Sequence, residues 1–241
     1  MLHSVNYLTH LNIMRTSLVR EIGGWKPQTD GAQDWDIFFR ITERTQHIAR
    51  IPSILYHWRI LPTSTATGLE TKPYAVKGQL LAQQNHFKRK GLPAVVLSTP
   101  EGLFHVRWQV EARSADVIVC QTGSQKQLAN LLGLLWKGQQ NVIRQLYVLH
   151  SARIPAWRES FHHIWDDRLV SIPCDVVNWR SGLETVAKGN NDQTIVLIDG
   201  TASDLSDDLV EELAGWVDQH PEIAWTSAVA LNRKGIVYEA G

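Results

Sequence analysis

Two short apolar runs flank an amphipathic stretch in the second half of the chain, and this pattern restricts the fold more than any other feature. The first run covers 115–123 and ends in turn residues, and the second covers 142–149. Runs of this length are typical of strands buried in a parallel sheet. Between them, residues 125–136 place leucines at helical spacing, at Leu128, Leu131, Leu132 and Leu135. The pattern predicts a βαβ unit.

The same alternation continues toward the C-terminus. Residues 178–187 suit a helix, 194–199 suit a buried strand that ends in Asp199, and 205–217 suit a further helix. In open α/β sheets, ligands bind outside the carboxyl ends of the strands. We therefore expect an α/β fold of Rossmann-like mixed sheets flanked by helices, with Asp199 at the edge where ligands bind.

In the first half, residues 31–40 put two carboxylates, Asp34 and Asp36, just before an apolar run. Asp34 fits the start of a helix, where unpaired backbone N–H groups and the helix dipole favour an ionised carboxylate. Apolar residues then recur at about helical spacing, so we expect one buried face and both carboxylates at the exposed mouth. A helix cap and a solvated acid in the first turn are the alternative interpretation.

The segments on either side of this helix carry further signals. Residues 12–25 predict a strand end, a short helix capped near Thr16 or Ser17, and a glycine pair that stops it. Residues 51–59 read Ile-Pro-Ser-Ile-Leu-Tyr-His-Trp-Arg, and Ser-Thr-Ala follows at 64–66. The pattern predicts a polar site seated on a scaffold of helices.

The segments at 14–25, 33–40, 51–59 and 64–66, in this order, resemble the acceptor half of a family 2 glycosyltransferase domain, which has the GT-A fold. The resemblance implies that Asp34, the acid of the Gln-Asp pair, is the general base that deprotonates the acceptor hydroxyl in an inverting sugar transfer. It makes His57 and Arg59 candidates for contacting the leaving diphosphate or a metal. Alternatively, His57 is a structural histidine whose hydrogen bonds are made within a strand, and Arg59 forms a structural salt bridge with Asp36. The substrate contacts that we expect are Gln33, Trp35, Asp36, Trp58 and Arg59.

Residues 114–241 resemble the nucleotide-binding half of a second domain of this kind, ending with a strand near 223–231 and a turn at Gly235. The resemblance implies nucleotide contacts from Thr122 and Asp199, and a divalent metal, manganese or magnesium, with His57 and Asp199 as candidate ligands. The Asp-x-Asp motif of the family reads Asp199-Gly200-Thr201 here. One carboxylate and one threonine make a poor site for a hard cation. Asp199 as the cap of the following helix is the alternative.

These resemblances predict three parts. Residues 1–70 form the acceptor half of one domain, 71–113 form a connector, and 114–241 form the nucleotide-binding half of a second, degenerate domain. The connector combines a helix over 74–90 with strands at 94–97 and 104–110, around the Pro-Glu-Gly turn at 100–102. Because each half lacks its counterpart, we expect a piece of a longer protein with tandem domains.

Charge and hydropathy exclude other classes of protein. The 24 basic and 24 acidic residues balance, so the chain has no basic footprint for a nucleic acid. No apolar stretch approaches the roughly twenty residues of a membrane helix. We expect a cytoplasmic protein, membrane-peripheral at most within a longer parent.

The sequence also contains cysteines, histidine and aspartate pairs, and tryptophans, which often form metal, disulfide or ligand sites, but here a structural role fits most of them better. Cys120 and Cys174 suit buried thiols better than a disulfide or a zinc site. The adjacent pairs at 162–163 (His-His) and 166–167 (Asp-Asp) suit the surface, because neighbouring side chains point apart. Most of the ten tryptophans suit cores, and Trp35 and Trp58 are the exceptions because they flank the expected site.

Two functions remain open. In the first, which the resemblance implies, the chain is a glycosyltransferase segment that moves a sugar from a nucleotide-sugar donor to a glycan or polysaccharide acceptor with inversion, using Asp34 as base. Alternatively, it is a catalytically incomplete module that binds carbohydrate or scaffolds a larger glycosyltransferase.

Overall fold

The computed structural model describes residues 2–8, 11–57, 73–99, 103–151, 161, 164–175, 179–189, 193–231, 234 and 236–240. The chain divides into two compact units between Arg107 and Trp108. We describe each unit by itself. Trp58, Arg59, the 64–66 and 100–102 segments and the 162–163 histidines fall outside the described residues.

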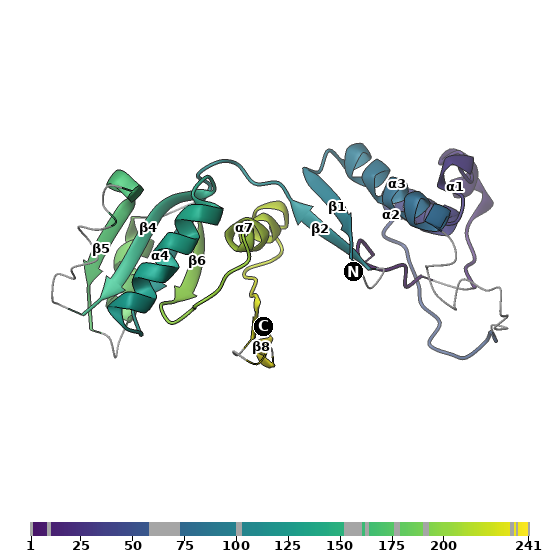
Figure 1. Cartoon of the computed structure of the whole chain (residues 1–241). Coiled ribbons are helices and arrows are strands. Elements are labelled where there is room, and N and C mark those ends of the chain that lie inside the picture. The colour runs from purple at the N-terminus through teal and green to yellow at the C-terminus, as the bar shows by residue number, and fades with distance from the viewer. Residues whose placement is uncertain are drawn as a thin grey trace. The chain divides into compact units, whose positions relative to one another are not determined.

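Unit 2 (108–241) is built on a four-stranded sheet in the order β5-β4-β3-β6 (Figure 1). Its strands are β3 (Ala115–Cys120), β4 (Ile143–His150), β5 (Leu169–Pro173) and β6 (Thr194–Asp199). Every pairing between them is parallel. The chain moves outward from β3 to β4 and β5 and then crosses back to pair β6 with the other side of β3. The direction of strand order therefore reverses between β3 and β6, which makes this junction the topological switch point of the sheet.

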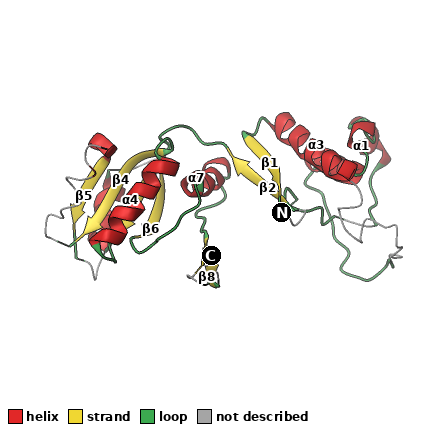
Figure 2. Cartoon of the chain, in the orientation of Figure 1, coloured by secondary structure: helices red, strands yellow, loops and turns green. Residues whose placement is uncertain are grey.

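Helices cover both faces of this sheet (Figure 2). On one face, α4 (Gln125–Gln139) and α7 (Leu209–Gln219) bury their apolar sides against alternate residues of β3 such as Val117 and Val119. On the other face, α6 (Arg180–Lys188) packs Val186 against Ile118 and Cys120. Because β3 is covered from both sides, all six of its residues are buried. The predicted α/β fold with a parallel sheet flanked by helices is confirmed.

Most of the predicted elements of unit 2 are present at nearly the predicted bounds, but two differ. The last helix begins at Leu209 and not at Leu205. The Gln139 side chain donates to the carbonyl of Ser206 and accepts from the amide of Val210, which fixes a turn before the helix. The strand expected over 223–231 is limited to β7 (Val229–Leu231), which pairs antiparallel with β8 (Val237–Ala240) in a separate sheet.

Unit 1 (1–107) contains α1 (Thr16–Glu21), the 3-10 helix η1 (Pro27–Thr29), α2 (Gln33–Thr42), α3 (Pro73–Lys90) and the paired strands β1 (Ala94–Ser98) and β2 (Phe104–Trp108), which ends at the boundary. The starts of α2 and α3 approach at Gly31 and Ala75, and their ends meet where Arg89 pairs with Glu43. A Cβ on Gly31 would lie 2.8 Å from the Ala75 Cα, and Gly31 has φ +86, so glycine is required here.

The predicted cap of α1 is wrong, although the predicted stop is confirmed. The helix begins at Thr16, Arg15 occupies the cap position, and no side chain caps it. Gly23 and Gly24 both have positive φ, and their amides bond back to the carbonyls of Arg20 and Val19.

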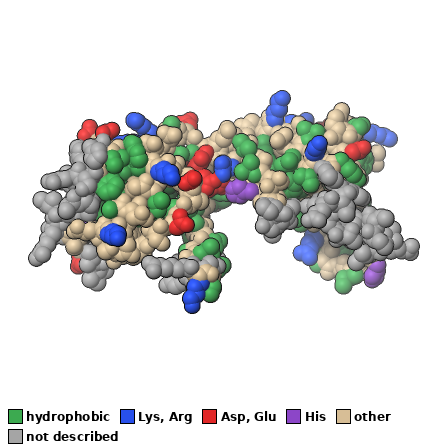
Figure 3. All heavy atoms as spheres, viewed as in Figure 1, with side chains coloured by type: hydrophobic (Ala, Val, Ile, Leu, Met, Phe, Trp, Pro, Cys, Tyr) green, Lys and Arg blue, Asp and Glu red, His purple; other side chains and the backbone are tan. Residues whose placement is uncertain are grey.

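Among the described residues, no helix is both long enough and apolar enough to cross a membrane. In and beside the β7–β8 hairpin of unit 2, the side chains of Val229, Leu231, Ile236 and Val237 are exposed. Figure 3 shows the hydrophobic side chains of the described residues in green.

Candidate functional site

The strongest candidate site lies where β3 and β6 end side by side. Cys120 and Asp199 are register partners at the carboxyl ends of these strands. The amide of Gly200 donates to the carbonyl of Cys120 at 2.8 Å. A Cβ added to Gly200 would lie only 2.5 Å from that oxygen, so the backbones approach too closely for a side chain. The loops that follow the strands also touch, because a Cβ on Gly123 would lie 3.1 Å from the Thr201 methyl carbon.

Asp199 is the centre of this junction. Its Oδ1 accepts hydrogen bonds from the Thr122 hydroxyl at 2.7 Å, the Thr201 hydroxyl at 2.6 Å and the Thr201 amide at 2.7 Å. Burial alone would raise the pKa of Asp199, but the hydrogen bonds from Thr201 and Thr122 outweigh burial and lower it. The carboxylate therefore stays ionised near neutral pH, and Asp199 remains exposed. Thr122 and Asp199, the two residues expected to contact a nucleotide, are in direct contact.

The metal-binding potential of this junction is limited by Thr201. The Thr201 hydroxyl stands where a second carboxylate would be, and it donates to Asp199. Unlike a second carboxylate, this hydroxyl brings no negative charge to the junction, and hard cations prefer charged oxygen ligands. Within the described parts of the chain, no group of three His, Cys, Asp or Glu residues is arranged to hold a metal ion.

Asp34 lies in the first turn of α2, as predicted. Its Oδ1 accepts from the Trp35 amide at 2.8 Å, and its Oδ2 accepts from the Asn6 side-chain amide at 3.0 Å. Each carboxylate oxygen has a second lone pair, so Asp34 retains capacity to accept a proton from a bound hydroxyl. Asn6 was not predicted from the sequence.

Asp36 is buried, so the expectation that it lies at the exposed mouth is wrong. It is 2% exposed, and both its Oδ2 and the Arg40 guanidinium are enclosed. Arg40 Nε donates to Asp36 Oδ2 at 2.9 Å, and Arg40 Nη1 donates to the carbonyl of Ile22 at 2.8 Å. The spacing of four residues puts the pair on one helical face. Arg59, the alternative partner of Asp36, lies outside the described residues.

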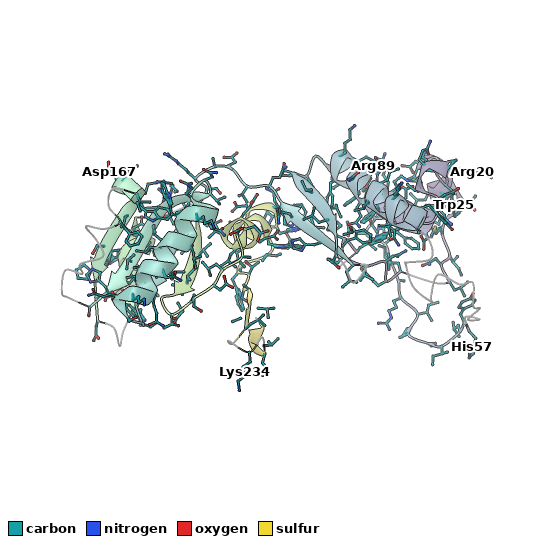
Figure 4. All side chains as sticks on the ribbon, in the orientation of Figure 1. Arg20, Trp25, His57, Arg89, Asp167 and Lys234 are labelled. Atoms are coloured by element: carbon teal, nitrogen blue, oxygen red, sulfur yellow. The ribbon has the colours of Figure 1, made fainter. Side chains whose placement is uncertain are left out.

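The other predicted residues of unit 1 lie in different surroundings. Trp35 is 2% exposed, and its indole N–H donates to the carbonyl of Leu2 at 2.8 Å. Gln33 is exposed, and its side-chain oxygen accepts from the amide of Gly31 at 2.8 Å. His57 is exposed on the loop after α2, away from α2 and α3 (Figure 4). The structure thus gathers Gln33, Asp34 and Asn6 near the start of α2.

Both cysteines are free thiols: Cys120 is buried, as expected, whereas Cys174 is only partly buried. The pKa of Cys120 is raised to about 11, mainly by burial and to a lesser extent by the neighbouring Cys174 and Asp199. Cys120 is therefore a protonated core thiol at the end of β3.

Comparisons with known proteins give two similarities. Over its whole length, the chain is 26% identical to the O-antigen biosynthesis protein RfbC of Myxococcus xanthus, but it spans only 19% of that protein. Over 127 residues, or 51% of the chain, it is 34% identical to the uncharacterized protein y4gI of Sinorhizobium fredii, of which it spans 14%. No family model matches the chain, and no solved structure gives a significant match.

Proposed function

We propose that the chain is a segment of an inverting glycosyltransferase that assembles a polysaccharide, and that the β3–β6 junction of unit 2 binds the nucleotide part of a nucleotide-sugar. The observation that carries this proposal is the contact between Thr122 and Asp199 at the switch point of a parallel sheet. Similarity over the whole chain to an O-antigen biosynthesis protein supports it, because the O-antigen is a polysaccharide.

The chemistry of the junction suits a nucleoside. Among the described residues, three donors bond to Asp199 Oδ1 and none to Oδ2. An oriented, ionised carboxylate is a good acceptor for ribose hydroxyls or for a base N–H. The α4 helix starts directly after this edge, with a Ser124 capping box, and its N-terminal dipole favours nearby negative charge such as a diphosphate.

In unit 1, we propose that Asp34 acts as the general base. The oxygen of an acceptor hydroxyl attacks the anomeric carbon of the donor sugar, and the bond from that carbon to the diphosphate oxygen breaks. The hydroxyl proton moves to Asp34, and the nucleoside diphosphate leaves with the bonding electron pair. Gln33, which is exposed beside Asp34, is our candidate for contacting the acceptor. Trp58, Arg59 and His57 keep their predicted roles toward the substrate and the diphosphate, and the roles proposed for Trp35 and Asp36 are to hold α2 in place from the core.

A second candidate is a carbohydrate-binding or scaffolding module that does not transfer sugar by itself. The Thr201 hydroxyl favours this alternative, because it replaces an acid at the position where the resemblance implies a metal ligand. Manganese or magnesium at Asp199 remains an expectation from the resemblance and is not needed for nucleotide binding in this account.

Transfer and binding can be tested separately on the purified chain. We expect nucleoside diphosphates to shift the backbone amide resonances of 120–124 and 199–201, and not those of the opposite end of the sheet around Ala115 and Thr194. Transfer from a panel of nucleotide-sugars to oligosaccharides is then compared in the wild type, Asp34→Asn and the matched control Asp30→Asn. Loss in Asp34→Asn alone supports the base. Nucleotide binding without transfer in any variant supports the second candidate, and the absence of both contradicts the proposal.

A further inference from the structure

Residues 2–6, here called the N-terminal strap, are hydrogen-bonded to two elements of unit 1, α2 and β2. The carbonyl of Leu2 accepts from the Trp35 indole at 2.8 Å, and the carbonyl of Ser4 accepts from the Phe104 amide at 3.4 Å. The Asn6 side chain donates to Asp34 Oδ2 at 3.0 Å. The strap therefore carries the one long-range hydrogen bond to Asp34 that the described residues show.

His3 fixes the middle of the strap in an aromatic cluster. Its ring lies 5.8 Å from Phe39 and 5.0 Å from Phe87, measured between ring centroids. The His3 Nε2 and His86 Nε2 atoms are 3.2 Å apart, which is a hydrogen-bond distance. His86, on α3, is 7% exposed and stacks on Phe39 at 4.4 Å. This contact connects the strap to the buried side of α3.

The hydrogen-bond partners determine which atom of each ring holds a proton. His86 Nδ1 is 2.6 Å from Glu43 Oε1, and Arg89 donates to the same carboxylate at 2.8 and 2.9 Å. Burial would raise the pKa of Glu43, but its bonds from Arg89 and His86 lower it, so Glu43 is an ionised acceptor. His86 Nδ1 must therefore be the donor to Glu43. In neutral His86 the proton is then absent from Nε2, and this nitrogen accepts from His3 Nε2–H.

A second proton on His86 cannot enter this contact while His3 keeps its proton on Nε2, because two N–H groups would then face each other across 3.2 Å. The groups that face His86 among the described residues are His3 from the strap, Glu43 from the end of α2, and Arg89 and Lys90 from α3. Burial is the largest cause that lowers the pKa of His86; Arg89 and Lys90 lower it further, and Glu43 opposes them. The neutral, accepting form is thus the form that prevails at neutral pH.

We propose that the N-terminal strap is a proton-sensitive positioning element for Asp34: neutral His86 holds the strap through His3, and Asn6 then holds the Asp34 carboxylate. Protonation of His86 releases the strap and, with it, Asn6. Asn6 is a positioning residue, since it acts through Asp34. The consequence for catalysis rests on the proposed role of Asp34 as base, whereas the pH-dependent release does not.

The direction of the pH effect follows from the lowered pKa of His86. The strap is closed above the ordinary histidine pKa of 6.5, where His86 is neutral in both the folded and the unfolded chain. As the pH falls below 6.5, the unfolded chain takes up the proton first, and the closed strap loses stability until His86 itself is protonated.

Nuclear magnetic resonance of the whole chain at pH 7.5 and pH 5.0 tests this proposal. The readouts are the Asn6 side-chain amide signal, the exchange protection of the Trp35 indole N–H, and the titration of the His86 imidazole carbon. The variant is His3→Phe, which keeps an aromatic ring against Phe39 but cannot bond to His86. The matched control is His47→Phe, at an exposed position. Asp34→Asn identifies the Asn6 signal that depends on Asp34.

We expect the protection factor of the Trp35 indole to fall about tenfold in the wild type between pH 7.5 and 5.0, which corresponds to the loss of about one net hydrogen bond. The Asn6 signal moves to the position of a free amide with the midpoint of the His86 titration. His3→Phe shows the low protection at both pH values, and His47→Phe behaves as the wild type.

Equal protection at both pH values in the wild type overturns the proposal, and so does pH dependence that persists in His3→Phe. An Asn6 signal that Asp34→Asn leaves unmoved overturns the positioning role. If His3→Phe does not fold, the wild-type midpoints alone decide, because a strap that opens without His86 titrating contradicts the mechanism. No readout uses a sugar or a nucleotide, so these outcomes are independent of the proposed transferase function.

Discussion

Gly200→Ala is the substitution that most directly probes the close approach of β3 and β6 on which the nucleotide site depends. The added Cβ would lie 2.5 Å from the Cys120 oxygen and 3.1 Å from the Gln121 Cα, both backbone atoms that cannot swing aside. Ordinary contact begins at 3.4 Å, so the strand ends must separate by about 1 Å. That movement breaks the 2.8 Å bond from the Gly200 amide to the Cys120 carbonyl.

The expected cost is the sum of two effects. Overpacking of a tight backbone contact costs about 1–3 kcal/mol. Loss of a net backbone hydrogen bond costs about 1 kcal/mol more. We therefore expect Gly200→Ala to lower the free energy of unfolding of unit 2 by about 2–4 kcal/mol.

Gly133→Ala is the matched control, because the same methyl group meets nothing within 4 Å in the interior of α4. There the substitution should stabilise the helix by about 0.5–1 kcal/mol. Native-state hydrogen exchange of the β3, β4 and β6 amides measures both effects in unit 2 alone. Equal effects of the two substitutions, or a loss below about 1 kcal/mol for Gly200→Ala, would refute the argument.

Three further substitutions or measurements check other parts of the structure. Arg40→Leu leaves the Asp36 carboxylate buried without its cation and should lower the free energy of unfolding by about 3–5 kcal/mol. The control Arg44→Leu removes an exposed ion pair and should change this free energy by at most about 1 kcal/mol. Thermal unfolding measures both variants, and similar losses would contradict the buried pair. Because the pKa of Cys120 is raised to about 11, only about 0.1% of this thiol is ionised at pH 8. Iodoacetamide should therefore modify Cys120 far more slowly than it modifies glutathione, and the rate should rise with pH up to about 11. A rate equal to that of glutathione, measured by mass spectrometry, would show that the thiol is not buried. Ser124→Ala removes the hydrogen bond that the Gln127 amide donates to the Ser124 hydroxyl and keeps the bond from the backbone amide of residue 124 to Gln127 Oε1. It should cost about 1 kcal/mol, and unchanged exchange protection in the first turn of α4 would contradict this cap.

Local patterns predicted the parallel sheet because its signals lie within short stretches of sequence. The run at 115–120 is apolar at almost every position, which fits a strand covered on both faces, and the leucines of 125–136 lie on one side of α4. The placement of Thr122 and Asp199 at one edge of the sheet also follows from sequence, because the carboxyl ends of parallel strands lie at one edge, but their hydrogen bond was not predicted.

Long-range partners could not be predicted in the same way. Asn6 contacts Asp34 across 28 positions, and nothing in the periodicity of the N-terminal segment indicates that contact. Asp36 carried a local signal, since Arg40 follows at a spacing of four residues, but the expectation of an exposed helix mouth took precedence over it. The start of α7 depends on the Gln139 side chain from α4, a tertiary contact that outweighs local helix preference.

The most direct test of the central claim is calorimetric titration of UDP into the purified chain, with and without manganese, alongside Asp199→Ala and the control Asp204→Ala. The account predicts that the wild type and Asp204→Ala bind UDP equally, that manganese is not required, and that Asp199→Ala weakens binding at least about tenfold. Binding that survives Asp199→Ala, or no binding of UDP by the wild type under either condition, would contradict a nucleotide site at the β3–β6 junction.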